Sequence, residues 1–272
     1  MPRALAIGAH PDDIEFVMAG TLLLLKEAGW ELHYFNVSSG NLGSLTSPPA
    51  ETARVRRAEA RAAARVLGAT WHPPICDDLQ IFYDDRTLRR FAAVIRDAGP
   101  SVILTHAVRD YMEDHMTTSR LAVTAAFARE LPGYRTIPRR APSPGAVTIY
   151  HASPHGLRDG LRRVVRPGAF VDTTSVHDRK RAALECHTSQ RRFLDVTQGM
   201  DDYVRTMEDF SRSVGKLSGR YRHAEGWRRH LHFGFCEPGA DPLRDALGRH
   251  YLVSRAYESR LNAADGEGAS GS

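Results

Sequence analysis

The first half of the chain alternates apolar, strand-like runs with helix-like runs, and this alternation limits the fold more than any other feature. Strands are expected at 3–10, 31–40, 70–76 and 101–106. Helices are expected at 15–29, 51–68, 86–99 and 118–131. This order is typical of parallel sheets, because parallel strands need a crossover connection. The sequence therefore predicts an α/β fold with a Rossmann-like, doubly wound and mainly parallel sheet.

The second half is less regular. A Pro-rich connector, "RTIPRRAPSPGA", precedes expected strands at 147–153 and 169–174. Two helices are expected after them, from His177 to about Phe193 and from Asp201 to about Ser218. We find no internal repeat and no clear linker, so residues 1–261 are expected to form one domain with a C-terminal elaboration. Residues 262–272 are small and polar, and we expect a disordered tail there.

Composition narrows the class of protein. Lys and Arg outnumber Asp and Glu by 37 to 32 in 272 residues, a net charge of +5. The excess is spread along helices and loops without a nucleic-acid-binding motif, so no nucleic-acid partner is expected.

Cys76, Cys186 and Cys236 lack CxxC spacing and are interpreted as reduced thiols. With no signal-peptide pattern and no run of membrane-spanning length, we expect a soluble cytoplasmic protein without a membrane partner; monomer and homo-oligomer stay open.

Polar side chains follow two of the expected strands. The stretch "AIGAHPDDIEF" places His10, Asp12 and Asp13 directly behind the first strand, and "THAVRDYMEDHMTTS" places His115 in a polar loop after the fourth. These two strands are expected to be neighbours where the strand order reverses, which is where open α/β sheets bind ligands. One His or Asp at a strand end is more often a cap or turn residue, but two clusters at matching positions favour a site. Three protein ligands are typical of catalytic zinc, so His10, Asp13 and His115 are the predicted metal ligands, and Asp12 is left free to act as a base.

These motifs resemble those of a known family. "AHPDDIE" with a distal "DH" is similar to the LmbE or PIG-L family of zinc-dependent N-acetylglucosaminyl deacetylases. Supporting segments are "RRAEARAAARVLGA", "DYMEDHMTTSRL", "KRAALECHTSQ" and "AEGWRRHLHFG". The resemblance implies that His10, Asp13 and His115 bind Zn²⁺ or another divalent metal. It also implies that Asp12 is the general base.

Five further residues are candidates for substrate contact: Arg56, Asp78, Tyr111, Asp114 and His187. For three of them the sequence also allows a purely structural role. Arg56 is equally consistent with a solvent-facing helix position paired with Glu59. Asp78 is equally consistent with a turn residue, and His187 with packing against the site. Asp114 is also a candidate for orienting His115 from outside the ligand set.

The chain departs from the family pattern at Met112. Many members have His-Pro-Asp-His in the second motif, and the first His assists proton transfer near the leaving group. Met112 cannot carry a proton. The role is therefore vacant or moved to Glu113, Tyr111, Asp110 or a histidine elsewhere, such as His151 or His230.

The implied activity is removal of an N-acetyl group from an amino sugar or an N-acetylglucosaminyl-bearing metabolite, with Asp12 activating a water at the metal. A role in secondary metabolism is the expectation. The alternative is a metal-dependent hydratase of an unsaturated dicarboxylic acid on the same fold. A third hypothesis, a sugar- or nucleotide-binding module without chemistry, predicts no stoichiometric zinc. A dinucleotide-binding oxidoreductase is disfavoured because no GxGxxG follows the first strand.

Overall fold

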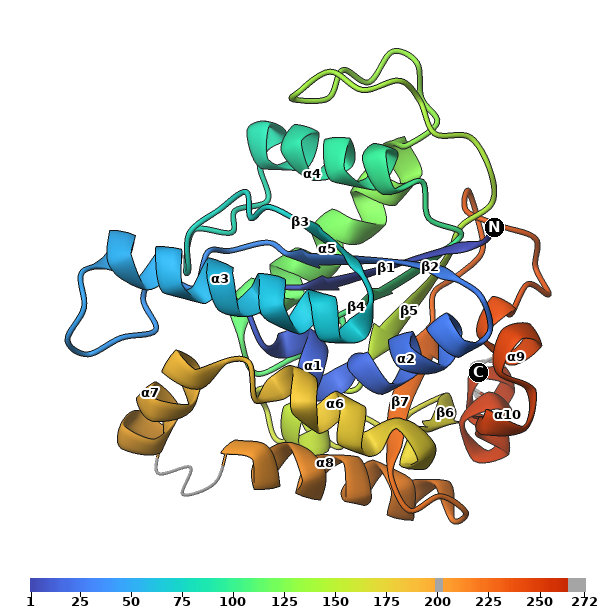
Figure 1. The fold of residues 1–272 in the computed structure, drawn as a ribbon. Coiled ribbons are helices and arrows are strands. Elements are labelled where there is room, and N and C mark those ends of the chain that lie inside the picture. The colour runs from blue at the N-terminus through green and yellow to red at the C-terminus, as the bar shows by residue number, and fades with distance from the viewer. Residues whose placement is uncertain (199–202, 264–272) are drawn as a thin grey trace, which may run out of the picture.

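A central sheet organises the structure, a computed structural model that describes residues 1–198 and 203–263 (Figure 1). Within these residues the sheet has eight strands in the order β3-β2-β1-β4-β5-β7-β6-β8. The strands are β1 Arg3–Gly8, β2 Glu31–Asn36, β3 Thr70–His72, β4 Val102–Thr105, β5 Thr148–Ala152, β6 Ala169–Asp172, β7 Ala224–Arg229 and β8 Tyr251–Val253. Strands β1 to β5 pair in parallel, whereas β6, β7 and β8 are antiparallel additions. The predicted doubly wound, mainly parallel sheet is confirmed.

The strand order reverses between β1 and β4. The chain runs from β1 outward through β2 to β3, and then returns to place β4 on the other side of β1. Ala4 lies opposite Val102, and Ile7 lies opposite Thr105. The carboxyl ends of β1 and β4 therefore open side by side, as the sequence predicted.

Both faces of the sheet are buried, as expected for parallel strands with helical crossovers. Along β1, Ala4 and Ala6 face one apolar core, and Leu5 and Ile7 face the other. Helices α2 and α3 cover the first face, and α4 and α5 cover the second (Figure 1). The helices are α1 Asp13–Val17, α2 Ala19–Glu27, α3 Pro49–Leu67, α4 Asp85–Ala98, α5 Glu113–Ala128, α6 His177–Leu184, α7 Thr188–Gln198, α8 Tyr203–Ser218, α9 Pro242–Leu247 and α10 Arg255–Ala263, with short 3₁₀ turns at His155–Leu157, Thr174–Val176 and Gly248–His250.

Two predicted helices are each divided in the structure. The helix expected at 15–29 breaks at Met18 into α1 and α2. The carboxylate of Glu225 accepts hydrogen bonds from the backbone N–H groups of Gly20 and Thr21, both at 2.8 Å. A distant side chain thus caps the start of α2, which no local pattern could reveal. The helix expected from His177 likewise divides into α6 and α7.

The C-terminal elaboration is larger than the sequence predicted. Strands β7 and β8 and helices α9 and α10 were not anticipated. Of the expected tail, 262 and 263 belong to α10, and the remainder lies outside the described residues. The three cysteines are free. Among the described residues, no helix has both the length and the apolar character needed to cross a membrane.

Candidate metal centre and active site

The candidate site lies at the carboxyl ends of β1 and β4. His10 and Asp12 follow β1, and Asp13 begins α1. His115 lies in the first turn of α5, which begins at Glu113. The sequence predicted a loop there and a helix start at 118, so that boundary was wrong by five residues. A helical first turn fixes the direction of His115 more firmly than a loop would.

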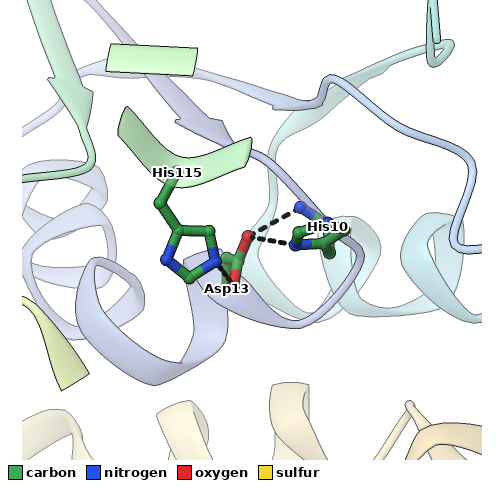
Figure 2. Close-up of side chains that lie close together, drawn as sticks. All are labelled: His10, Asp13 and His115. Carbon is green, nitrogen blue, oxygen red and sulfur yellow. Dashed lines mark hydrogen bonds and ion pairs between the residues drawn. The ribbon is translucent and has the colours of Figure 1, made fainter. Parts of the chain in front are cut away.

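The structure brings His10, Asp13 and His115 together (Figure 2). Their ligand atoms lie within 4.8 Å of one another. Nδ1 of His10 is 3.5 Å from one oxygen of Asp13, and Nε2 of His115 is 3.3 Å from the other. Asp13 thus stands between the two imidazoles, so the two nitrogens and the carboxylate face a common point.

Two outer carboxylates hold the imidazoles in this orientation. Oδ2 of Asp114 lies 2.9 Å from Nε2 of His10, and Oδ1 of Asp110 lies 3.1 Å from Nδ1 of His115. Each ring therefore has one nitrogen held by a carboxylate and the other directed at Asp13. Histidines that ligate metals commonly have such a partner on the second nitrogen. The alternative role predicted for Asp114, orienting His115, is wrong, because Asp114 holds His10 and Asp110 holds His115.

The charge at the centre favours a cation. Burial lowers the pKa of His10, but the carboxylates of Asp114 and Asp13 outweigh it and raise the pKa to about 9. Burial also opposes protonation of His115, whereas Asp13 and Asp110 raise its pKa to about 10. The pKa of Asp13 is held well below its usual value by His115 and His106, against the effect of burial. Buried carboxylates stabilise positive charge here, so a divalent ion fits the donor set.

A second group of donors overlaps the first: His106, Asp110 and His115. His106 stacks on His115 with ring centroids 4.1 Å apart. Its Nε2, however, accepts the backbone N–H of Ala9 at 2.8 Å. Oδ1 of Asp110 is already engaged with His115 and with the N–H of Met112. In the His10 group, Nδ1 of His10, Nε2 of His115 and Oδ1 of Asp13 accept no N–H from the described backbone, although Oδ2 of Asp13 accepts the N–H of His10 at 2.6 Å. This group is therefore the better candidate.

Asp12 is not part of this group, although it lines the same cavity as the three donors. Its Oδ2 accepts the Tyr203 hydroxyl at 2.6 Å, and its Oδ1 lies 3.9 Å from a guanidinium nitrogen of Arg56. Asp12 is 6% exposed and has a φ of 107°, a backbone conformation that L-residues adopt only when the surroundings impose it. Burial raises the pKa of Asp12 to about 6, and Arg56 opposes this rise. Sequence reasoning missed Tyr203, because it is 191 positions from Asp12 and no local pattern marks it.

Arg56 is buried in the wall of the site. It is 1% exposed, and its guanidinium donates to the carbonyl oxygen of Pro11. The solvent-facing alternative is therefore wrong. Glu59, the partner expected in that alternative, instead accepts two hydrogen bonds from Ser189.

The other predicted contact residues divide into two groups. Asp78 and Tyr111 line a cavity of about 270 Å³, which the three donor residues also line. Asp114 does not line it and contacts His10 instead. Both oxygens of Asp78 already accept hydrogen bonds, from Ser38 and from the N–H groups of Gly40 and Leu42. His187 is fully buried, lies 3.4 Å from Glu15, and does not line the cavity.

The structure narrows the candidates for the role vacated at Met112. His151 lies 2.9 Å from the carbonyl oxygen of His106 through Nδ1 and 3.0 Å from His230 through Nε2. Neither His151 nor His230 lines the cavity, whereas Tyr111 and Asp110 do. His155, which the sequence did not single out, also lines it, with its ring between Phe16 and Phe210.

Comparison with known proteins is consistent with this geometry. The family described as "PIG-L: GlcNAc-PI de-N-acetylase" matches residues 5–126. A 4-oxalmesaconate hydratase of Pseudomonas putida is 32% identical over 195 residues, which cover 69% of this chain and 73% of the hydratase. A diacetylchitobiose deacetylase of Thermococcus kodakarensis is 27% identical over 233 residues, covering 83% of this chain and 82% of the deacetylase. The solved N,N'-diacetylchitobiose deacetylase of Pyrococcus horikoshii shares the fold, with a TM-score of 0.69, 22% identity, and coverage of 85% of this chain and 84% of that one.

These relatives are enzymes of two kinds, deacetylases and a hydratase. The matched segment contains His10, Asp12, Asp13, Arg56 and His115. By sequence and by fold, the chain belongs to the PIG-L, or LmbE, family.

Proposed function

We propose that this chain is a metal-dependent N-deacetylase that acts on an N-acetylated amino sugar or glycoconjugate. His10, Asp13 and His115 are the proposed metal ligands, and Asp12 is the proposed general base. The observation that carries the proposal is that two adjacent aspartates have different surroundings. Asp13 stands between the two imidazoles, and Asp12 is buried beside them, held by Tyr203 and Arg56.

A divalent ion in this site would supply Lewis acidity, both to activate a water and to polarise the amide carbonyl. The protein supplies the remaining steps. Asp12 accepts the proton of the attacking water, and Tyr203 and Arg56 keep its carboxylate in place. Asp110 and Asp114 keep the two imidazoles in orientation. Proton delivery to the departing amine is assigned to a protic side chain of the cavity wall, where His155 and Tyr111 lie.

Hydration of an unsaturated dicarboxylic acid is the second candidate. Met112 in place of the family histidine and the 32% identical hydratase favour it. The cavity favours the deacetylase. Among the described residues that line it, Arg56 is the one Lys or Arg side chain, and it already contacts Asp12 and Pro11. A substrate with two or more carboxylates is commonly bound by several fixed positive charges, and this wall offers one arginine besides the proposed metal centre.

The test is an acetate-release assay on N-acetylglucosamine and its glycosides, run beside a hydration assay on unsaturated dicarboxylic acids. We expect acetate release by the zinc-loaded protein and no hydration. Asp12→Asn should lower kcat by about 10² to 10⁴, the usual contribution of a general base. Hydration without acetate release would replace the deacetylase with the hydratase. Full activity of Asp12→Asn would remove Asp12 from the mechanism.

A further inference from the structure

The mouth of the cavity carries three exposed apolar side chains from three separate loops. Leu42 is 45% exposed, Leu79 is 62% exposed and Tyr111 is 58% exposed, and all three line the cavity. They follow β2, β3 and β4, three parallel strands of the same sheet, in which β1 lies between β2 and β4. We call these three side chains the apolar rim. Single exposed apolar residues are ordinary on protein surfaces, but a group of them around one cavity is typical of a ligand-binding edge.

Leu79 occupies a backbone position that disfavours leucine. Its φ is 60°, in the left-handed region where glycine and asparagine are favoured. Its N–H donates to Oδ2 of Asp114 at 2.9 Å, so the same carboxylate holds Leu79 and His10. A large apolar side chain is thus fixed in a strained conformation, pointing into solvent beside the site. Strain of this kind is concentrated at functional sites.

The loops that carry the rim are joined to one another. The carboxylate of Asp78 accepts the N–H of Leu42 at 3.0 Å, and the side chain of Asn41 accepts the N–H of Asp78 at 2.9 Å. Asp78 immediately precedes Leu79 in the chain. Leu42 and Leu79 are therefore held by one hydrogen-bonded unit, and the rim is preorganised.

The rim continues into the cavity as an apolar wall. Phe16, Val17 and Met112 line the same cavity as the rim and the three donor residues. The occupant that fits this continuity is an apolar part of the substrate whose amide lies at the centre. A stable protein interface needs about 800 Å² per partner, far more than three side chains supply.

We propose that the apolar rim binds an aromatic or alkyl substituent of the substrate, so that the preferred substrate is an N-acetylated amino sugar carrying an apolar aglycone. This inference rests on the proposed deacetylase function and adds its substrate class. Each methylene group that the rim buries should raise kcat/KM by about fourfold. A phenyl group should therefore raise it by at least about tenfold.

The experiment compares acetate release from N-acetylglucosamine and from its phenyl β-glycoside, using the zinc-loaded full chain. We expect a kcat/KM at least about tenfold higher for the phenyl glycoside. Leu79→Asn should reduce this preference several-fold. The variant should remain folded, with a Tm at or above that of the wild type, because asparagine suits the left-handed backbone. Leu42→Asn serves as a second rim variant, with the same expected loss of preference.

Leu131→Asn is the matched control. Leu131 is 45% exposed, follows the C-terminal end of α5 and does not line the cavity, so its substitution should leave the preference unchanged. Equal kcat/KM for both substrates would overturn the apolar rim while leaving the deacetylase standing. Absence of acetate from both substrates would overturn the deacetylase itself. A preference that survives both rim substitutions would place the apolar contact elsewhere and overturn the assignment.

Discussion

Asp12 and Asp13 are adjacent in sequence and have opposite surroundings. Asp13 is set between His10 and His115, whereas Asp12 is buried against Tyr203 and Arg56. The backbone at Asp12 is left-handed, with a φ of 107°, and the two adjacent carboxylates have different partners. One aspartate therefore suits a cation, and the other suits proton transfer.

The Tyr203 hydroxyl positions the Asp12 carboxylate, and its removal should lower catalysis. Tyr203→Phe deletes a hydrogen bond to a charged acceptor, which typically contributes ~1.5–3 kcal/mol. We expect kcat for acetate release to fall by about tenfold or more, with a smaller change in KM.

Tyr150→Phe is the matched control. The Tyr150 hydroxyl donates to Asp241 at the same 2.6 Å and is equally buried, but Asp241, unlike Asp12, does not line the cavity. Tyr150→Phe should lower stability and leave kcat unchanged. Equal kcat values for Tyr203→Phe and the wild type would show that Tyr203 does not position the base.

At the residue scale, the sequence was most informative where function is local. His10, Asp12 and Asp13 lie within four positions, and a strand end followed by such a group predicts a site by itself. Tyr203 and His155 could not be predicted, because their contacts to this site are made by distant parts of the chain. The position of Arg56 was ambiguous, because the local sequence of a helix does not show whether an arginine is buried or exposed. Its burial depends on tertiary packing.

At the scale of elements, α6 is attached to the sheet by a buried ion pair. Lys180 donates to Glu225 of β7 at 2.7 Å, and the two side chains are 0% and 1% exposed. Glu225 also caps the start of α2 through Gly20 and Thr21. One carboxylate thus joins α2, α6 and β7. Lys180 is the first residue of the segment "KRAALECHTSQ", so at least this residue of the segment has a structural role.

Lys180→Met should be strongly destabilising. Removing one partner leaves a buried, uncompensated charge, which costs about 3–5 kcal/mol. Urea denaturation of Lys180→Met and Arg179→Met measures the difference. Arg179 is the neighbouring control, since its 3.0 Å pair with Glu27 has side chains 48% and 52% exposed. Such a surface pair contributes about 0–1 kcal/mol. Similar losses in the two variants would contradict this account of α6.

The parallel strands were predictable, and the antiparallel ones were less so. Buried parallel strands are apolar along their whole length, which is visible in "RALAIG" and "VILT". Strand β7 has the sequence "AEGWRR", which carries no such pattern. It forms because β5 and β6 pair with it on either side, and such long-range pairing leaves little local signal.

At the scale of the whole molecule, buried histidines link stability to pH. Burial lowers the pKa of four of them to about 4: His72, His151, His177 and His223. In the unfolded chain their pKa returns to about 6.5, so the unfolded state binds these protons first as the pH falls. Their contribution to stability is therefore present above pH 6.5 and is lost toward pH 4. Asp12, His10 and His115, whose pKa values are raised to about 6, 9 and 10, act in the opposite direction. Most of the effect of His10 and His115 falls above pH 6.5, so the four lowered histidines dominate below it.

We expect the free energy of unfolding to be lower at pH 4.5 than at pH 7 by at least ~1 kcal/mol. Urea denaturation at the two pH values measures it. His223 stacks on His177 with ring centroids 3.8 Å apart, so His223→Phe keeps an aromatic ring and removes the protonation. The variant should lose less stability on acidification than the wild type. Equal losses would show that the stacked pair is not a source of the pH dependence.

The whole arrangement depends on the reversal of strand order between β1 and β4, which brings two remote segments together at one candidate cation site. The most direct measurement is the metal content of three proteins, the wild type, Asp12→Asn and Asp13→Asn, after loading with zinc and dialysis. The account predicts about one tightly held ion per chain in the wild type and in Asp12→Asn, and loss of that ion in Asp13→Asn. Retention of the ion by Asp13→Asn, or its loss from Asp12→Asn, would contradict the roles assigned to these two carboxylates.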